Sequence, residues 1–231
     1  MIVTFYSFKG GTGRTMALAN IAVSMAKAGN RVLAVDFDLE APGLWRFFQG
    51  IEPDLDRRDG LLDLLTSQSQ RTSVSLVDWR EYVTPLTFDG GWISLMTSGR
   101  ADSSYASRVL SFNWQAFFQN NNGGPFFERL RGEWAEEYDF VLIDSRTGIT
   151  DIGGVCTIAL PDLIVPVLVA NQQNVEGVLE VLRRAQEGRQ RLAYDRPPAL
   201  VLPILSRFDS RTEYGSASEW LDMLAEKLSP L

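Results

Sequence analysis

Apolar runs rich in β-branched residues alternate along the chain with segments whose apolar residues recur at helical spacing. Six runs have the composition of strands buried on both faces of a sheet: Met1–Phe8, Arg31–Asp38, Trp92–Ser98, Asp139–Ser145, Leu163–Ala170 and Ala199–Leu205. Helical spacing occurs at Thr15–Ala28, Phe126–Glu137, Asn174–Leu192 and Ser216–Leu228. Strands that alternate with helices predict an α/β fold, with a mostly parallel twisted sheet flanked by helices on both faces.

The length of the chain and its polar stretches predict one domain with one insertion. A chain of 231 residues suits a single domain over residues 1–231. The segment from about Glu52 to Gly91 contains "DLDRRDG" and "TSQSQRTS", which predicts a polar insertion at the surface. The stretch "QNNNGGP" predicts a turn at residues 119–125.

Charge and composition exclude several kinds of function. The 22 basic and 29 acidic residues give a net charge of −7, which is poorly suited to binding nucleic acid or anionic lipid over the whole surface and leaves only a local basic patch open. We therefore expect no membrane partner and find no strong indication of nucleic acid. Without histidine the usual zinc ligand and general base are missing, and a single cysteine rules out an intrachain disulfide. No apolar stretch approaches eighteen residues, and Met1 leads directly into a predicted strand, so we expect a cytoplasmic protein.

The stretch "KGGTGRT" (residues 9–15), named here the phosphate loop, lies between a predicted strand and a predicted helix. Its glycines permit positive φ, so successive backbone N–H groups can turn toward a phosphate. The helix start adds a partial positive charge, and a hydroxyl at Thr15 suits Mg²⁺. The strict pattern G-x-x-x-x-G-K-[ST] is nevertheless broken, by Phe8 and by Arg14. The alternative is a plain glycine turn. Nucleotide contacts are expected from Gly10, Gly11, Thr12, Gly13, Arg14, Thr15 and Met16.

Carboxylates follow two of the predicted strands. Asp36 and Asp38 stand two apart in "AVDFDLEAPGL" and so point to the same side of an extended chain. Asp144 ends the apolar run of "YDFVLIDS". Nucleoside triphosphatases place such carboxylates beside a phosphate loop to hold Mg²⁺ and a water molecule. The alternative for Asp38 is that it only caps a helix start.

The arrangement K-G-G-x-G-[K/R]-T resembles the deviant phosphate loop of the ParA/MinD family of P-loop NTPases, and in particular a bacterial branch with arginine in the loop. The D-x-D pair and the strand-ending Asp144 follow in the family's order, so the resemblance spans nearly the whole chain. It implies an ATP-binding, Mg²⁺-dependent NTPase that dimerises around nucleotide and switches a partner protein by hydrolysis.

The resemblance also implies roles for individual residues. Lys9 would reach the nucleotide of the partner subunit, and Arg14 would replace the lysine that contacts phosphate within the chain. Asp38 would orient the attacking water. Metal would be held by Thr15, Asp36 and Asp144. Ser206 and Arg207 stand where ParA-like proteins often carry an Asn-Arg pair beside adenine.

Departures from the family pattern leave other functions open. Arg14 in the loop and Arg146 in "DSRTG", where the family has "DTPPG", favour a nucleotide-gated scaffold with little or no hydrolysis. A DNA- or membrane-partitioning ATPase would need a basic surface, whereas the C-terminal helix carries Glu219, Asp222 and Glu226 against Lys227.

Other notable residues have simpler interpretations. We expect Arg146 to pair with an acid and Cys156 to be buried as a small residue. The arginines on the fourth predicted helix are expected to face solvent, and the large aromatics to pack in the core and in the insertion. These arginines are Arg183, Arg184, Arg189 and Arg191.

Overall fold

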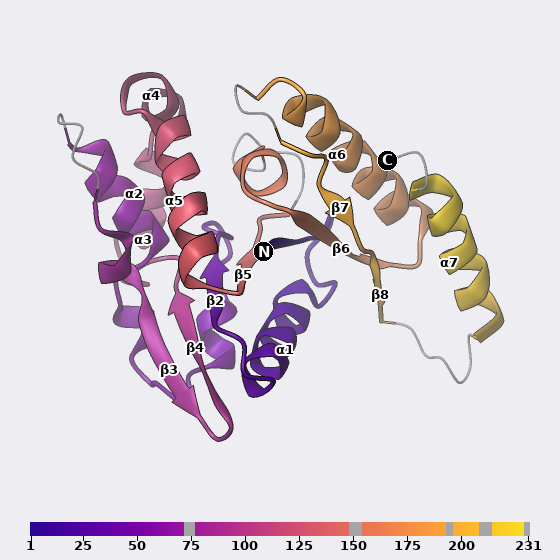
Figure 1. The fold of residues 1–231 in the computed structure, drawn as a ribbon, viewed down its shortest axis with the longest axis horizontal. Coiled ribbons are helices and arrows are strands. Elements are labelled where there is room, and N and C mark those ends of the chain that lie inside the picture. Colours follow the sequence, from indigo (N-terminus) through magenta and orange to yellow (C-terminus); the bar gives the residue numbers. More distant parts are fainter. Residues whose placement is uncertain (72–76, 148–153, 193–195, 208–213, 229–231) are drawn as a thin grey trace.

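The computed structural model describes residues 1–71, 77–147, 154–192, 196–207 and 214–228. Within them, the strands are β1 (Ile2–Tyr6), β2 (Val32–Asp36), β3 (Thr84–Phe88), β4 (Gly91–Met96), β5 (Phe140–Asp144), β6 (Leu163–Val169), β7 (Leu200–Val201) and β8 (Ile204–Ser206). The α-helices are α1 (Arg14–Lys27), α2 (Leu61–Ser69), α3 (Tyr105–Ser111), α4 (Trp114–Asn120), α5 (Gly123–Glu137), α6 (Gln172–Arg189) and α7 (Tyr214–Leu228). Figure 1 shows their arrangement around the sheet.

The strands form one sheet in the order β3-β4-β2-β5-β1-β6-β7, and β8 also pairs with β6. The pair β3–β4 is antiparallel, whereas the other pairs are parallel. Strand β1 therefore lies between β5 and β6, and the carboxyl ends of these strands meet at one edge of the sheet. This confirms the predicted α/β fold with a mostly parallel sheet. The antiparallel edge strand β3 was not predicted.

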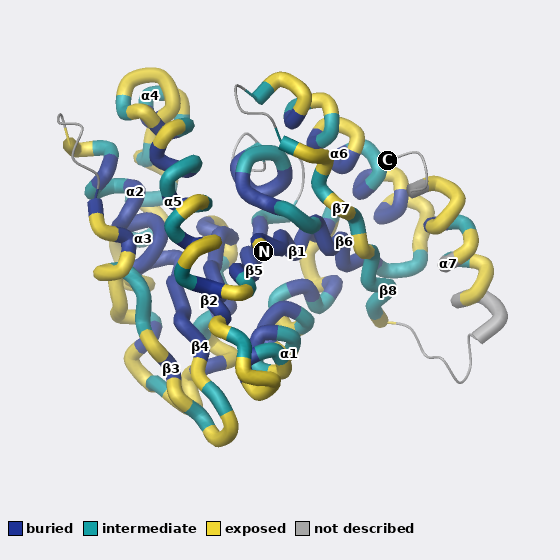
Figure 2. The backbone as a smooth tube through the Cα atoms, viewed as in Figure 1, coloured by how far each residue is buried: buried dark blue, intermediate teal, exposed yellow. Residues whose placement is uncertain are grey.

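Helices cover both faces of the sheet because neighbouring residues of each strand point in opposite directions. On β1, Val3 and Phe5 pack against α1, whereas Ile2 and Tyr6 pack on the other face, in clusters that hold residues of α2, α5 and α6. Figure 2 shows that the inner strands are buried along their length while the outer sides of the helices are exposed.

The expectation of a polar surface insertion at residues 52–91 is wrong for its middle part. Leu61, Leu62, Leu64 and Leu65 of α2 are fully buried, and Trp79 is buried with them. The run "LLDLL" supplies apolar residues all around a short helix, which predicts a buried helix. Residues 72–76, which include part of "TSQSQRTS", lie outside the described residues.

The single strand predicted at Ala199–Leu205 is divided in two. Leu202 donates its N–H to the Ile164 carbonyl, after which Pro203 has no N–H to continue the ladder. Strand β7 ends before this point and β8 begins after it. The turn predicted at residues 119–125 is shorter than expected: it is confined to Asn121 and Asn122, with a φ of 56° at Asn122, and residues 123–125 already begin α5.

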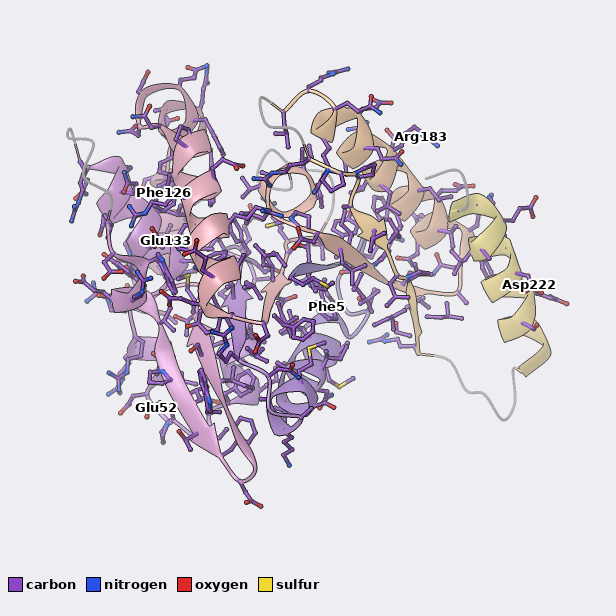
Figure 3. All side chains as sticks on the ribbon, in the orientation of Figure 1. Phe5, Glu52, Phe126, Glu133, Arg183 and Asp222 are labelled. Carbon is purple, nitrogen blue, oxygen red and sulfur yellow. The ribbon has the colours of Figure 1, made fainter. Side chains whose placement is uncertain are left out.

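The C-terminal helix packs against the domain through its apolar side. Leu224 of α7 is buried in a cluster with Val178 and Leu182 of α6, and Trp220 and Met223 pack against this cluster. In Figure 3, Arg183 on α6 and Asp222 on α7 lie on the outer side of these helices, whereas Phe5 lies inside. No helix among the described residues is long and apolar enough to cross a membrane.

Candidate functional site: the phosphate loop and its carboxylates

The phosphate loop joins the end of β1 to the start of α1, as expected. Gly11 has a φ of 74° and Gly13 a φ of 86°, values that favour glycine at both positions. Gly13 also accepts the first helical hydrogen bond, from the N–H of Ala17 at 2.9 Å. Thr12 is buried, whereas Gly10, Gly11 and Met16 are exposed. The loop thus leads directly into the positive end of a helix that points toward an accessible surface.

Helix α6 holds the beginning of this loop. The Phe8 ring lies so close to Gly177 that a Cβ at position 177 would be 2.3 Å from the ring. Beside this contact, the Lys9 ammonium donates to the side-chain oxygen of Gln173. Phe8, which breaks the strict phosphate-loop pattern, therefore serves as the packing contact between the loop and α6.

Arg14 is buried and its guanidinium contacts two carboxylates. Its Nε lies 2.5 Å from Asp144 Oδ1 and its Nη2 lies 2.8 Å from Asp38 Oδ2, while its Nη1 is 3.4 Å from the Ser7 hydroxyl. Only 6% of Arg14 is exposed. Burial lowers the pKa of Arg14, but the two carboxylates more than offset this and raise it overall, so the group stays charged. The structure therefore brings Arg14, Asp38 and Asp144 together.

Asp36 is fully buried and accepts hydrogen bonds from backbone N–H groups. Its Oδ2 accepts from Gly43 at 3.1 Å and Leu44 at 3.0 Å, and its Oδ1 accepts from Asp38 at 3.2 Å. Burial, together with the charge of Asp144, raises the pKa of Asp36 to about 8. Asp36 thus fixes the segment that follows β2, and its oxygens already have partners.

Asp144 and Thr15 fit a site for hydrated Mg²⁺. The Thr15 hydroxyl donates to the Asp144 side chain. Asp144 Oδ2 is buried with no hydrogen-bond partner, and burial raises the pKa of this carboxyl although Arg14 acts in the opposite direction. A buried acceptor without a partner beside a hydroxyl suits a cation that keeps several waters. Among the described residues, no three acidic or cysteine side chains cluster closely enough to hold a metal by themselves.

Residues 37–44, named here the switch segment, are tied to three neighbouring elements. Besides the bonds to Asp36 and Arg14, the Tyr105 hydroxyl of α3 donates to the Leu39 carbonyl at 2.9 Å. Burial raises the pKa of Tyr105 to about 12, so this hydroxyl keeps its proton. Arg146 lies 2.5 Å from Glu40, which confirms that Arg146 pairs with an acid.

Arg207, which follows β8 directly, lies beside the phosphate loop. The Arg207 Nη2 lies 3.7 Å from the position that a Cβ on Gly11 would occupy, and Arg207 has a φ of 53°. The Ser206 hydroxyl is 3.3 Å from the Leu168 carbonyl. Both residues were proposed for the site because they match the position of an Asn-Arg pair in the family that the sequence resembles. Arg207 does lie beside the loop.

A surface pocket of about 330 Å³ opens over the phosphate loop. Loop residues 10–16 and Asp38 line it, together with Ser7, Ala41, Phe47 and Thr147. These last four were not among the residues predicted for the site. Ser7 follows β1 directly and Thr147 lies in the segment just after β5, so their positions near strand ends were a usable signal. Phe47 follows the switch segment and carries no such signal.

Three other interpretations concern residues away from the pocket. Arg189 is buried, contrary to the expectation of a solvated face, and donates to the carbonyls of Ile158, Pro161 and Pro197. Cys156 is buried and free, as expected. Of the large aromatics, Trp79, Phe48 and Phe117 are buried, whereas Phe47, Trp92 and Phe118 are partly exposed.

Fold and site together define an α/β protein of the P-loop class, with a glycine-rich loop between the central strand and its helix. A family model described as the CobQ/CobB/MinD/ParA nucleotide binding domain matches residues 3–230. The chain therefore belongs to this family of nucleotide-binding domains, and the ParA/MinD resemblance inferred from the sequence is confirmed.

Individual relatives agree with this assignment. The chain is 27% identical, over 91% of its length, to a protein of Thermus thermophilus described as a probable plasmid-partitioning protein ParA. The septum site-determining protein MinD of Pyrococcus horikoshii, solved with Mg-ADP, is 20% identical with a TM-score of 0.67 over 95% of this chain and 76% of that chain. The ParA of pNOB8, solved bound to nonspecific DNA, has a TM-score of 0.66 at 20% identity over 99% of this chain and 74% of that chain. The chain spans 59% of the Thermus protein and 33% of another curated relative.

Proposed function

We propose that the chain is an Mg²⁺-dependent ATPase of the ParA/MinD type that forms a dimer around nucleotide and regulates a partner protein. One observation carries the proposal: a single pocket joins the phosphate loop to Asp38, with the buried Asp144 beside Arg14. Such a pocket provides backbone donors for phosphate, a carboxylate near the attacking water and an acceptor for a hydrated cation. Mg²⁺, when bound by Thr15 and Asp144, would neutralise charge on the phosphates.

In this proposal Lys9 acts between subunits. Its ammonium is exposed at the start of the loop and contacts Gln173 of its own chain, so it can reach outward when a second subunit arrives. A second cation at the phosphates stabilises the charge that develops during transfer, and a closed dimer excludes water. Ser206 and Arg207 are proposed to border the base.

The proposal is tested by comparing the parent protein with Lys9→Ala and Asp38→Ala. Affinity for a fluorescent ATP analogue, sedimentation with and without ATP, and phosphate release are measured for each. We expect Lys9→Ala to keep affinity in the monomer but to lose dimerisation and hydrolysis, and Asp38→Ala to keep affinity but lose hydrolysis. Lys27→Ala, at the exposed last residue of α1, serves as the control. Failure of the parent protein to bind nucleotide would refute the proposal.

A nucleotide-gated scaffold is the second candidate function, and the contacts of Arg14 favour it. A guanidinium held by two carboxylates must be redirected before it can serve the transferred phosphate, which would slow turnover. Nucleotide-dependent dimerisation without phosphate release is the result that would support the scaffold over the ATPase.

A further inference from the structure

The Arg14 guanidinium links the side chains of Asp144 and Asp38, in two segments that are also joined by the hydrogen bond from the Phe37 N–H to the Asp144 carbonyl at 2.9 Å. Asp144 ends the buried strand β5 and is 1% exposed, whereas Asp38 belongs to the switch segment. Within the described residues, Arg14 is the one cation in an ion pair with Asp38. The other bond of the Asp38 carboxylate is local, to the Ala41 N–H at 3.4 Å. The Asp38 N–H is held by Asp36 Oδ1, so it is the Asp38 carboxylate whose position depends on the guanidinium.

The same guanidinium lies at the end of the phosphate loop. Arg14 is the first residue of α1 and lines the pocket together with Gly11 and Gly13. A phosphate held by the loop amides would carry more negative charge than one carboxylate. It could also accept two parallel hydrogen bonds from the Arg14 guanidinium. Phosphate and Asp38 would thus compete for the same donor. Asp144, at the end of a buried strand, has less freedom to move away.

We propose that Arg14 is a latch, which holds Asp38 until phosphate binds in the loop and then releases the middle of the switch segment. The proposal rests on the proposed function, because it requires a phosphate in the loop. Release is confined to the Asp38 side chain and residues 39–42, since Asp36 holds the amides of Asp38, Gly43 and Leu44 from the sheet side. Two contacts oppose the movement: the Glu40–Arg146 pair, which is half exposed on its acidic side and therefore weak, and the hydrogen bond from the Tyr105 hydroxyl to the Leu39 carbonyl.

Arginine is suited to this task and lysine is not. Three nitrogens of Arg14 face three different acceptors, namely Asp144, Asp38 and Ser7. A lysine has a single nitrogen on a flexible stem and cannot hold two carboxylates in a fixed plane. The exchange of lysine for arginine in the loop is therefore explained by the coupling of two carboxylates as well as by phosphate contact.

The test is hydrogen exchange of the backbone amides at 39–41, measured with and without ATP and Mg²⁺. The measurement is made in a Lys9→Ala background, which we expect to stay monomeric and sedimentation verifies, so that closure of a dimer does not mask release. We expect ATP to speed exchange of these amides by at least about tenfold, since a bond to a charged group is lost. The amides of Gly43 and Leu44 should not change and serve as the internal control.

Arg14→Lys and Asp38→Asn test the latch without nucleotide. Both should show the faster exchange at 39–41 before ATP is added, and Asp38→Asn leaves the Arg14–Asp144 pair to support the fold. Arg31→Lys, which alters an exposed pair with Asp139, should leave exchange at 39–41 as in the parent. Equal exchange in parent, Arg14→Lys and Asp38→Asn would overturn the latch.

Binding of a fluorescent ATP analogue, measured in parallel, separates the two proposals. If ATP binds and exchange at 39–41 stays constant or slows in the Lys9→Ala background, the latch is wrong and the proposed function stands. If no nucleotide binds, the proposed function is wrong, while the comparison of the variants without ATP still decides whether Arg14 holds the segment.

Discussion

At the scale of single residues, Asp139 and Arg31 join the beginnings of β5 and β2, at the edge of the sheet away from the phosphate loop. Asp139 accepts from both the side chain and the backbone N–H of Arg31, and these bonds lower the pKa of Asp139 to about 2. A carboxyl whose pKa is lower in the folded than in the unfolded chain stabilises the fold above its unfolded pKa, and this contribution is lost as pH falls toward 2.

We therefore expect Asp139→Asn to change the acid unfolding of the protein. The parent should lose stability between about pH 4 and pH 2 partly through Asp139, and the variant should show a shallower decline in this range. Urea unfolding at pH 2, 3, 4 and 6 measures the difference. The prediction is contradicted if the two proteins lose stability in parallel over this range.

The second residue-scale prediction concerns Asp36, whose two oxygens accept three backbone N–H groups. Asp36→Asn would place an NH₂ group against N–H donors and leave at least one bond unmade, which should cost about 1–3 kcal/mol of unfolding free energy. Asp89→Asn, at an exposed position, should change stability by less than about 0.5 kcal/mol. Urea unfolding at pH 7 compares them, and equal stability of both variants would refute the loop-fixing role of Asp36.

Several site residues could be found from the sequence because their signals are local. Gly11, Gly13 and Arg14 stand in a motif, and Asp38 and Asp144 follow apolar strands. The bonds from Arg14 to both carboxylates could not be found in this way, because they join residues from three separate strand ends. Nor could the three amides around Asp36, since they depend on how the switch segment turns back.

At the scale of elements, α6 positions the phosphate loop through the contact of Gly177 with the Phe8 ring. In Gly177→Ala the new Cβ would lie within 2.3 Å of the ring, so Phe8 and the start of the loop must shift. We expect lower stability, by about 1–3 kcal/mol as in other overpacked sites, and weaker ATP binding. Thermal unfolding and the affinity for a fluorescent ATP analogue measure both effects.

Gly132→Ala is the matched control on α5. A Cβ at Gly132 meets no atom within 4 Å, so this helix-interior glycine can accept alanine. The substitution should stabilise the protein by about 0.5–1 kcal/mol and leave nucleotide affinity unchanged. If Gly177→Ala behaved like Gly132→Ala, the Phe8 contact would not hold the loop.

The sequence predicted the long strands and helices well because their apolar periodicity extends over many residues. Prediction failed for short segments in which polar residues or proline interrupt or flank the apolar residues. The segment of helix α2 was predicted to lie at the surface because polar stretches flank "LLDLL". Strand β3 was not predicted because Pro85 and two threonines weaken its apolar pattern. Pro203 divided the last strand, an effect that local sequence does predict when proline is weighed against the apolar run.

At the scale of the whole molecule, the net charge determines whether we expect the protein to bind nucleic acid. A net charge of −7 disfavours a polyanion over most of the surface. We expect this chain with ATP and Mg²⁺ to show no binding to a fluorescent DNA duplex at about 150 mM salt, the physiological ionic strength, in anisotropy measurements. Saturable binding that weakens as salt rises would contradict this and favour a partitioning function.

The central place of β1 has a consequence for the order in which the molecule forms. The Met1 ammonium donates to the Asp139 carbonyl, 138 residues further along the chain, and β1 pairs with β5 on one side and β6 on the other. Contacts of such long sequence separation form slowly, because closing the intervening loop costs conformational entropy. We therefore expect the nucleotide pocket, built at the end of β1, to form late during refolding, so that nucleotide added to the denatured chain should speed refolding little.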